Sequence, residues 1–266
     1  MDREILLTND DSVSANGIRY FAEILRDYGN VTIVAPRDPQ SAKSASLTMG
    51  YPLLLSKVKY EEELPGRGSL TIYNLTGTPC DCTKFGMNMF ISQGKMPDFV
   101  LSGINHGSNA SAAAIDSGTL GAVKEGTLYG IPSMGFSLCS HLEDPDFSVV
   151  DFFGRKILER FFESPPEKGV YLNVNFPYLP IDEIKGIRFA RQGAGRWIRE
   201  FVRLEEPKGR EFYWMTGEFV SLDSEQTEGY SADHLLNGNG YVSIVAHRID
   251  TTDYTEIERL DNLWNL

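Results

Sequence analysis

The sequence predicts an α/β fold of Rossmann-like type, in which a mostly parallel sheet carries helices on both faces. Up to about residue 177, short apolar segments typical of strands alternate with longer amphipathic segments typical of helices. The strand segments are apolar almost throughout, as parallel strands buried on both faces are. With 266 residues, of which 41% are hydrophobic, the chain has the size of one large domain, and we expect a single domain over 1–266.

The expected elements follow one another without an internal repeat or a low-complexity linker. In the first helix, Ile18, Phe21 and Leu25 recur at spacings of three and four residues. Gly29 ends this helix, and Pro36 ends the strand that follows it. The expected strands lie at 4–8, 30–36, 98–105, 131–138 and 170–177, and the expected helices at 15–29, 80–92, 118–130 and 151–164.

A hairpin is expected over 186–220, where two long strand-like segments flank the turn sequence EPKGRE. Both segments carry many aromatic and charged residues. Such a hairpin either projects as an arm that grips a neighbouring subunit or packs on its own domain, and the composition alone favours neither. Because no internal repeat or low-complexity linker divides the chain, we expect one main domain with a projecting hairpin.

The charge excludes one large class of partners. The formal net charge is −12 and the isoelectric point is about 4.8, so the chain would repel long nucleic acids.

The cysteines Cys80, Cys82 and Cys139 are too few for a disulfide framework and suit a reducing compartment. The pair in C-x-C is interpreted as buried small side chains rather than a metal site. No membrane span or signal peptide is evident, so we expect a cytoplasmic protein.

Oxygen-bearing side chains follow three of the predicted strands. They are Asn9, Asp10 and Asp11 after the first strand, Ser41 and Ser44 in the loop after the second, and Asn105 and Asn109 after a later one. Because the carboxyl ends of parallel strands share one edge of a sheet, these side chains converge there. Such oxygens, without clustered His or Cys, favour Mg²⁺ or Mn²⁺ over zinc. A bound dication would also neutralise the two adjacent carboxylates.

Each of these residues also has a simpler interpretation. Asp10 or Asp11 could cap the following helix, and Ser41 could be a structural loop hydroxyl. Asn105 could be a turn residue that tolerates a left-handed backbone. The convergence of all of them at one sheet edge favours the metal site.

The sequence IDSGTLGAVKEG places Ser117, Gly118 and Thr119 at the start of a helix. Free backbone N–H groups and the helix dipole favour a phosphate group there, although an ordinary Ser or Thr cap explains the same residues. A cation beside a helix N-terminus suits hydrolysis of a phosphate ester. In that reaction Asp10 would ligate the cation and orient or deprotonate the attacking water. His106 in the neighbouring loop either contacts substrate or is a surface residue.

In these stretches the chain resembles the SurE family, the stationary-phase survival proteins, which are metal-dependent nucleotidases. The matching motifs are ILLTNDD, VTIVAPRDPQSAKSASLT, LTGTPCDCTKFG, SGINHGSN and SGTLGAVKEGTLYGIPS, in the family's order and spacing. The motifs LNVNFP, RQG, PKGREFYW and GYVSI follow further on. The resemblance covers nearly the whole chain and is densest up to about residue 140.

The resemblance implies a phosphomonoesterase that hydrolyses nucleoside monophosphates, with 5′- and 3′-nucleotides both open as substrates. It implies one divalent cation per subunit, Mg²⁺ or Mn²⁺, held by Asp10, Asp11, Ser41 and Asn105, with the first two as the catalytic pair. It implies a phosphate site formed by Asn9, Asn109, Ser117, Gly118 and Thr119. The hairpin and the C-terminal segment would join subunits into dimers or tetramers.

The departures from the family pattern concern the substrate rather than the cation. Ser12 replaces a usual glycine and Asn16 a usual proline. The stretch ASAAAID ends at Asp116 where the family has an aromatic residue, which puts a carboxylate beside the expected phosphate. That charge would weaken anion binding or alter contacts with the base. The stretch IVAHRID also departs, so no function is carried over to His247.

Two other functions compete with this interpretation. A haloacid-dehalogenase-type phosphatase needs a nucleophilic Asp two residues before a second Asp, but Asn9 precedes Asp11 at that spacing and Ser12 follows Asp10. The alternative from another class is a nucleotide-binding or scaffold protein of the same fold without turnover. A full set of cation ligands argues against it, and metal-dependent release of phosphate would distinguish the two.

Overall fold

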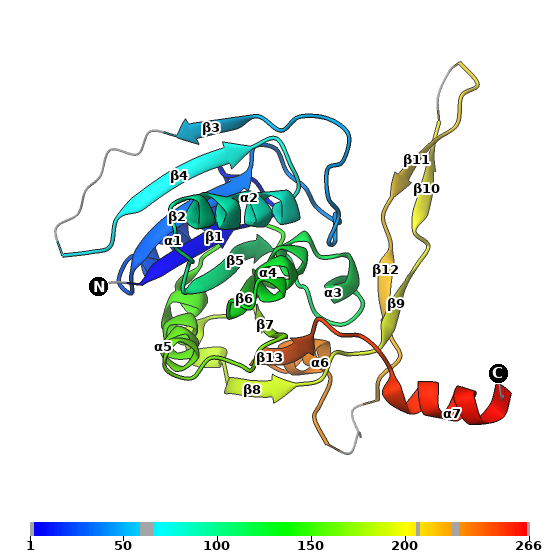
Figure 1. Cartoon of the computed structure of the whole chain (residues 1–266). Coiled ribbons are helices and arrows are strands. Elements are labelled where there is room, and N and C mark those ends of the chain that lie inside the picture. Colours follow the sequence, from blue (N-terminus) through cyan, green and yellow to red (C-terminus); the bar gives the residue numbers. More distant parts are fainter. Residues whose placement is uncertain (1–2, 59–65, 206–207, 225–228, 265–266) are drawn as a thin grey trace.

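A nine-stranded sheet forms the centre of the computed structural model, which describes residues 3–58, 66–205, 208–224 and 229–264 (Figure 1). The strand order is β3–β4–β2–β1–β5–β6–β7–β13–β8. The strands are β1 (Glu4–Thr8), β2 (Asn30–Pro36), β3 (Leu55–Val58), β4 (Leu70–Leu75), β5 (Phe99–His106), β6 (Ser133–Leu138), β7 (Val170–Phe176), β8 (Gly186–Ala190) and β13 (Tyr241–Arg248). The six neighbouring strands β4, β2, β1, β5, β6 and β7 run parallel. At the two ends of this group, β3 pairs antiparallel with β4, and β13 pairs antiparallel with β7. The predicted α/β class with a mostly parallel sheet is confirmed.

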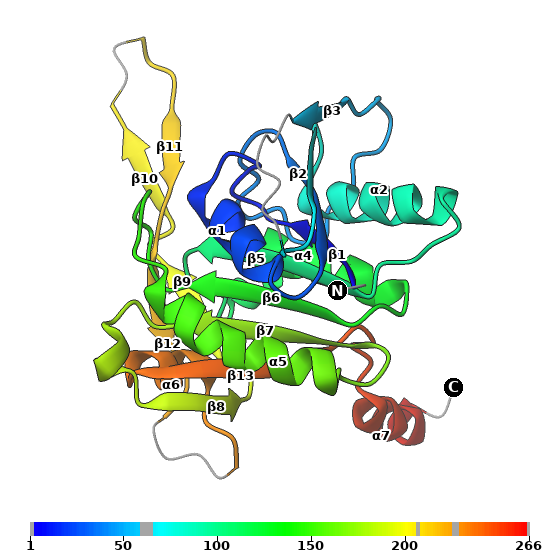
Figure 2. The ribbon, with the colours of Figure 1, turned by 90° about the vertical axis from the view of Figure 1, so that its left-hand side faces the viewer.

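Helices cover both faces of this sheet, as the apolar strands predict. One face carries α1 (Asn16–Leu25) and α5 (Arg155–Glu163), and the other carries α2 (Pro79–Ser92) and α4 (Gly118–Leu128) (Figure 2). Two short helices, α3 (Ala113–Asp116) and α6 (Asp233–Gly238), lie in the connections. The helix expected over 151–164 begins with a π-helical turn, Val150–Gly154, before α5.

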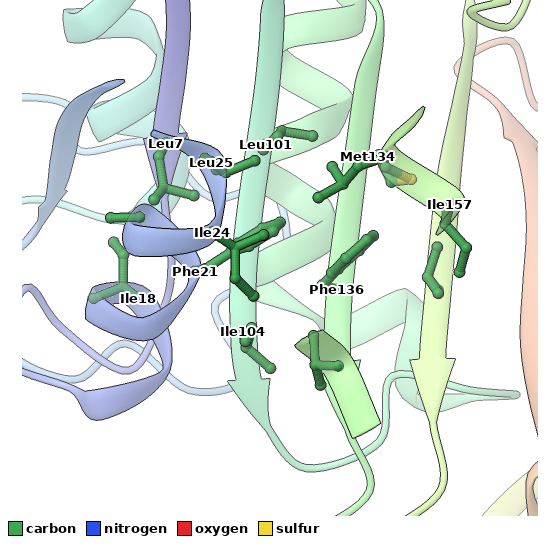
Figure 3. Packing of buried hydrophobic residues seen from close by; sticks show 14 of the residues in the cluster. Leu7, Ile18, Phe21, Ile24, Leu25, Leu101, Ile104, Met134, Phe136 and Ile157 are labelled. Carbon is green, nitrogen blue, oxygen red and sulfur yellow. The ribbon is translucent and has the colours of Figure 1, made fainter. Parts of the chain in front are cut away.

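The larger hydrophobic core lies between the sheet and the helices α1 and α5. There Phe21 stacks on Phe136, with ring centroids 4.8 Å apart (Figure 3). Both rings are fully buried, and burial of each contributes about 2 to 3 kcal/mol to stability. Cys80 and Cys82 of α2 are buried on the opposite face, as the sequence predicts.

The hairpin leaves the body of the molecule as a projecting arm (Figure 1). It pairs β9 (Gly195–Ile198) with β12 (Glu218–Ser221) and, farther out, β10 (Phe201–Leu204) with β11 (Phe212–Met215). The arm begins near Gly195 rather than at residue 186, because 186–190 form β8 and pair with β13 in the main sheet. Each long strand expected in the arm is interrupted, at Arg199 and at Gly217, where φ is positive. Residues 206–207 of the expected turn lie outside the described residues.

The chain ends in a helix that stands apart from the sheet. This helix, α7 (Tyr254–Trp264), buries none of its residues (Figure 1). Throughout the described ranges, no helix has both the length and the apolar character needed to cross a membrane.

Candidate active site

The strand order places a topological switch point between β1 and β5. From β1 the chain proceeds outward to β2 and β4, whereas from β5 it proceeds the other way to β6 and β7. The connections that leave the carboxyl ends of β1 and β5 therefore diverge, and open α/β sheets bind ligands at such a point. Asp10 and Asp11 follow β1, and Asn105 lies near the end of β5, so the topology brings them together.

Asp10 is almost fully buried at this point, with 5% of its surface exposed. Its Oδ1 accepts a hydrogen bond of 2.6 Å from the hydroxyl of Thr119 in the first turn of α4. Burial and, to a smaller degree, the charge of Asp11 raise the pKa of Asp10 from 3.8 to about 7. Asp10 has therefore lost most of its hydration and has a like charge beside it.

Asp11 contacts the neighbouring strand end. Its Oδ2 accepts a hydrogen bond of 3.1 Å from the backbone N–H of His106, and burial raises its pKa as well. Among the described residues, no Lys or Arg forms an ion pair with Asp10 or Asp11. In the same part of the chain, no third His, Cys, Asp or Glu completes a metal-binding group. A cation bound to this pair would depend on neutral oxygens for its other ligands.

A cavity of about 450 Å³ opens over Asp10. The predicted site residues that line it are Asp10, Ser41, Asn105, Asn109 and Ser117. The hydroxyl of Ser44 instead donates a hydrogen bond of 2.7 Å to the carbonyl of Ile115. The structure thus separates two serines between which the residues alone could not choose: Ser41 lines the cavity, whereas Ser44 attaches its loop to α3.

Hydrogen bonds orient the two asparagines of the cavity. The side chain of Asn105 donates to the carbonyl of Gly107 at 2.8 Å, which leaves its amide oxygen available to a ligand. The side chain of Asn109 donates to the hydroxyl of Ser137, and its backbone N–H donates to Asn175, both at 2.8 Å. Because these bonds form within the folded protein, little ordering remains for a ligand to impose.

Two of the predicted phosphate-binding residues lie deeper than the cavity. Asn9 is fully buried, and its side chain donates to the carbonyl of Ser12 at 2.8 Å, while its Oδ1 has no partner among the described residues. Thr119 is also fully buried, and its hydroxyl donates its hydrogen bond to Asp10. In this structure both residues support the Asp10 loop instead of lining the cavity.

The first turn of α4 approaches Asp10 closely. The hydroxyl of Ser117 accepts a hydrogen bond of 3.1 Å from the N–H of Leu120, so Ser117 is the N-cap and also lines the cavity. A Cβ at Gly118 would lie 2.9 Å from the Cβ of Asp10. Only glycine therefore allows the helix N-terminus to come this near to the carboxylate.

Several cavity residues carry no signal in the sequence. Trp197, Glu200, Met215 and Thr216 come from the arm, and His141 from the loop after β6. None belongs to a motif with chemical meaning, because only the folded arm and loop bring them to the cavity. Sequence reasoning missed them for that reason.

Two residues with open roles in the sequence also line the cavity. Asp116 does so from the end of α3, next to Ser117. His106 does so as well, and its Nδ1 lies 3.0 Å from the carbonyl oxygen of Leu142. His106, the last residue of β5, is therefore both a cavity residue and a contact to the loop that follows β6.

Comparison with known proteins identifies the family of the chain. A sequence model of the family described as "Survival protein SurE" matches residues 5–199. A protein of Phocaeicola vulgatus described as "5′-nucleotidase SurE" is 42% identical over 262 residues, with 98% of this chain and 96% of that protein covered. One of Caldanaerobacter subterraneus subsp. tengcongensis with the same description is 38% identical, with 98% and 97% covered. The crystal structure of the SurE protein from Aquifex aeolicus is similar with a TM-score of 0.79 and 33% identity, with 98% of this chain and 99% of that chain covered. By these matches the chain belongs to the SurE family.

Proposed function

We propose that this chain is a 5′-nucleotidase, which hydrolyses nucleoside monophosphates to nucleoside and phosphate. The observation that carries the proposal is the carboxylate pair at the switch point, the buried Asp10 and the half-buried Asp11, beside the first turn of α4. An acidic pair next to a helix N-terminus unites a cation site with an anion site, as hydrolysis of a phosphate ester requires. Relatives described as 5′-nucleotidases, matched over 98% of this chain, support the same reaction.

The proposal includes one divalent cation per subunit, held by Asp10, Asp11, Ser41 and Asn105. These residues fit a cation because the carboxylates of the buried Asp10 and the half-buried Asp11 lie together without a Lys or Arg partner in the described structure. Oxygen donors alone favour Mg²⁺ or Mn²⁺. When bound, such an ion supplies Lewis-acid stabilisation of the charge on the phosphate.

The remaining roles fall to the chain itself. Ser117 and Gly118 begin α4, where backbone N–H groups without helical partners are suited to a phosphate oxygen. Asn109 adds a side-chain N–H at the cavity. Asp10 orients the attacking water and accepts its proton, while Thr119 fixes the direction of that carboxylate.

Phosphate release tests the reaction. The protein is treated with EDTA, and release from a panel of 5′- and 3′-nucleoside monophosphates is measured after Mg²⁺ or Mn²⁺ is added back. We expect the cation to restore hydrolysis. Nucleotide binding without turnover by folded, metal-loaded protein would instead favour a nucleotide-binding or scaffold protein.

Two serines of one loop test the cation ligands. Ser41→Ala should raise the Mn²⁺ concentration for half-maximal activity about tenfold, because it removes a ligand oxygen. Ser44→Ala is the matched control, since the Ser44 hydroxyl bonds the carbonyl of Ile115. Equal shifts in the two variants would contradict the role of Ser41.

Self-association into dimers or tetramers is the second part of the proposal. The arm exposes Phe201 and Phe212, and α7 buries none of its residues, so both present apolar surface to a second copy. Light scattering of the purified protein would distinguish a dimer, a tetramer and a monomer. The three free cysteines agree with the cytoplasm as the proposed compartment.

A further inference from the structure

One wall of the cavity has no role in the proposed reaction. The arm builds this wall, and its residues Trp197, Glu200, Met215 and Thr216 line the same cavity as Asp10. The reaction uses only residues at the sheet edge and at the start of α4. Trp197 keeps 42% of its surface exposed, so part of an aromatic ring is open to a ligand.

Trp197 is firmly placed in spite of its exposure. Its ring meets that of Phe219 on the paired strand β12, with centroids 5.7 Å apart. Phe219 in turn meets the ring of His234 in α6 at 5.3 Å, and Nε2 of His234 lies 2.8 Å from the hydroxyl of Ser221. A row of three rings thus connects the indole to the body of the protein.

A buried carboxylate joins the root of the arm to another wall of the cavity. Asp233 is fully buried and accepts hydrogen bonds from the backbone N–H groups of Gly193, at 3.0 Å, and Ser111, at 3.1 Å. The side chain of Gln192 adds a hydrogen bond of 3.1 Å to the carbonyl of Ser111. The arm and the loop that leads to Asp116 are therefore fixed relative to each other.

We propose that Trp197, together with Met215, forms a nucleobase subsite in which the base of the substrate stacks on the indole. The inference rests on the proposed nucleotidase function and names the part of the substrate that the arm recognises. An indole stacks on every base because every base has a flat π-face. The flexible thioether of Met215 adapts to bases of different shape.

The charges in the cavity give the substrate one direction. Glu200 lines the cavity from the arm, and its carboxylate repels a phosphate on that side and accepts hydrogen bonds from sugar hydroxyls or base amino groups. The phosphate therefore lies toward Asp10 and the start of α4. The base lies toward the arm, over Trp197.

A substrate with a base and one without it test the subsite. The probes are AMP and ribose 5-phosphate, which share the sugar and the phosphate. In Trp197→Leu we expect KM for AMP to rise about tenfold at unchanged kcat, because stacking is lost while the reacting atoms are untouched. KM for ribose 5-phosphate should change by less than about twofold. Trp197→Phe keeps an aromatic ring and should restore most of the affinity for AMP.

Trp214 offers a matched control on the same arm. It is 65% exposed and is not among the residues that line the cavity. Trp214→Leu should keep KM for AMP within about twofold of the wild-type value. The subsite would be overturned if Trp197→Leu raised KM equally for AMP and ribose 5-phosphate. It would also be overturned if Trp214→Leu raised KM for AMP as much as Trp197→Leu does. If the wild-type protein hydrolyses neither substrate, the proposed function fails and the subsite fails with it.

Discussion

The catalytic edge of the sheet and the projecting arm meet in one cavity but are built in opposite ways. At the edge, β5 buries every residue except its last, and Thr119 of a neighbouring helix holds Asp10 in place. In the arm, every residue of β10 and β11 is exposed. The proposed reacting groups thus lie where the core fixes them, whereas the proposed contacts to the part of the substrate that does not react come from a surface ribbon.

This difference has an energetic basis. Burial of a charged group costs free energy, so a carboxylate such as Asp10 needs hydrogen-bond donors, such as the Thr119 hydroxyl, that the packed core holds in place. An aromatic platform costs little to build on an arm, because one face packs against the protein and the other stays in water. We therefore expect substitutions at the edge to lower kcat and substitutions in the arm to change KM.

The largest effect is expected at Asp10. Asp10→Asn removes a charged cation ligand and the proton acceptor for water, so kcat with Mn²⁺ should fall about a thousandfold. The melting temperature in EDTA should not fall, because burial already raises the pKa of Asp10 to about 7 and disfavours its charge. Asp38→Asn, at an exposed partner of Arg37, is the control and should keep kcat. Near-wild-type kcat in Asp10→Asn would remove Asp10 from the mechanism.

The second prediction compares the stability of the two regions. Phe136→Ala should lower the free energy of unfolding by about 3 to 5 kcal/mol, because the ring is fully buried and contacts Phe21 and Phe176. Phe201→Ala, at a residue of β10 that is 64% exposed, should change it by less than about 0.5 kcal/mol. Urea unfolding followed by circular dichroism measures both values. Similar losses in the two variants would show that the arm belongs to the cooperative core.

The edge could be predicted from the sequence, and physical reasons explain why. β1 and β2 lie at the residues expected for them, because each apolar run ends at a clear polar or proline boundary. Asp10, Ser41 and Asn105 line one cavity because parallel strands bring their carboxyl ends to one edge. The choice of Ser41 over Ser44 needed the structure or a resemblance, because both serines are equally suited to a loop.

The part played by the arm could not be predicted. Trp197 and Met215 line the cavity close to the strand breaks at Arg199 and Gly217, and Asp233 anchors the root of the arm. These are contacts between residues far apart in the sequence, and no local pattern records them. The sequence likewise assigns residues 186–190 to the hairpin, because their place in the main sheet depends on pairing with β13, which lies far along the chain. Local patterns predict which side of an element is buried, not where a surface ribbon meets the body.

A third prediction concerns His247 of β13, which pairs with Tyr171 of β7 in the main sheet. Its ring stacks on Tyr171 with centroids 5.1 Å apart, and its Nε2 is buried without a hydrogen-bond partner in the described structure. Burial lowers the pKa of His247 from 6.5 to about 4. Between these values the unfolded chain binds the proton and the folded protein does not. Above pH 6.5 His247 is neutral in both states and leaves the free energy of unfolding unchanged. Between pH 6.5 and pH 4 its titration lowers the free energy of unfolding, by at most about 3 kcal/mol in total.

Replacement of the imidazole tests whether the protein excludes water from His247 as it does from Asp10. His247→Phe keeps the stacked ring but cannot titrate, so its free energy of unfolding should fall less than that of the wild type between pH 7 and pH 4.5. Urea unfolding at the two pH values gives the difference, in which the other titrating groups cancel. Equal losses in both proteins would mean that His247 is well hydrated.

The smallest effect is expected at the contact between α4 and Asp10. In Gly118→Ala the new Cβ would lie 2.9 Å from the Cβ and 3.1 Å from the Oδ2 of Asp10, so the carboxylate must move by a few tenths of an ångström. Since reacting groups tolerate little misplacement, kcat should fall about tenfold while the protein still folds. Gly238→Ala is the control, because no atom lies within 4 Å of its Cβ position. If a folded Gly118→Ala keeps full kcat, the edge tolerates displacement as readily as a surface ribbon, and the rigid core is not what confines the chemistry to Asp10.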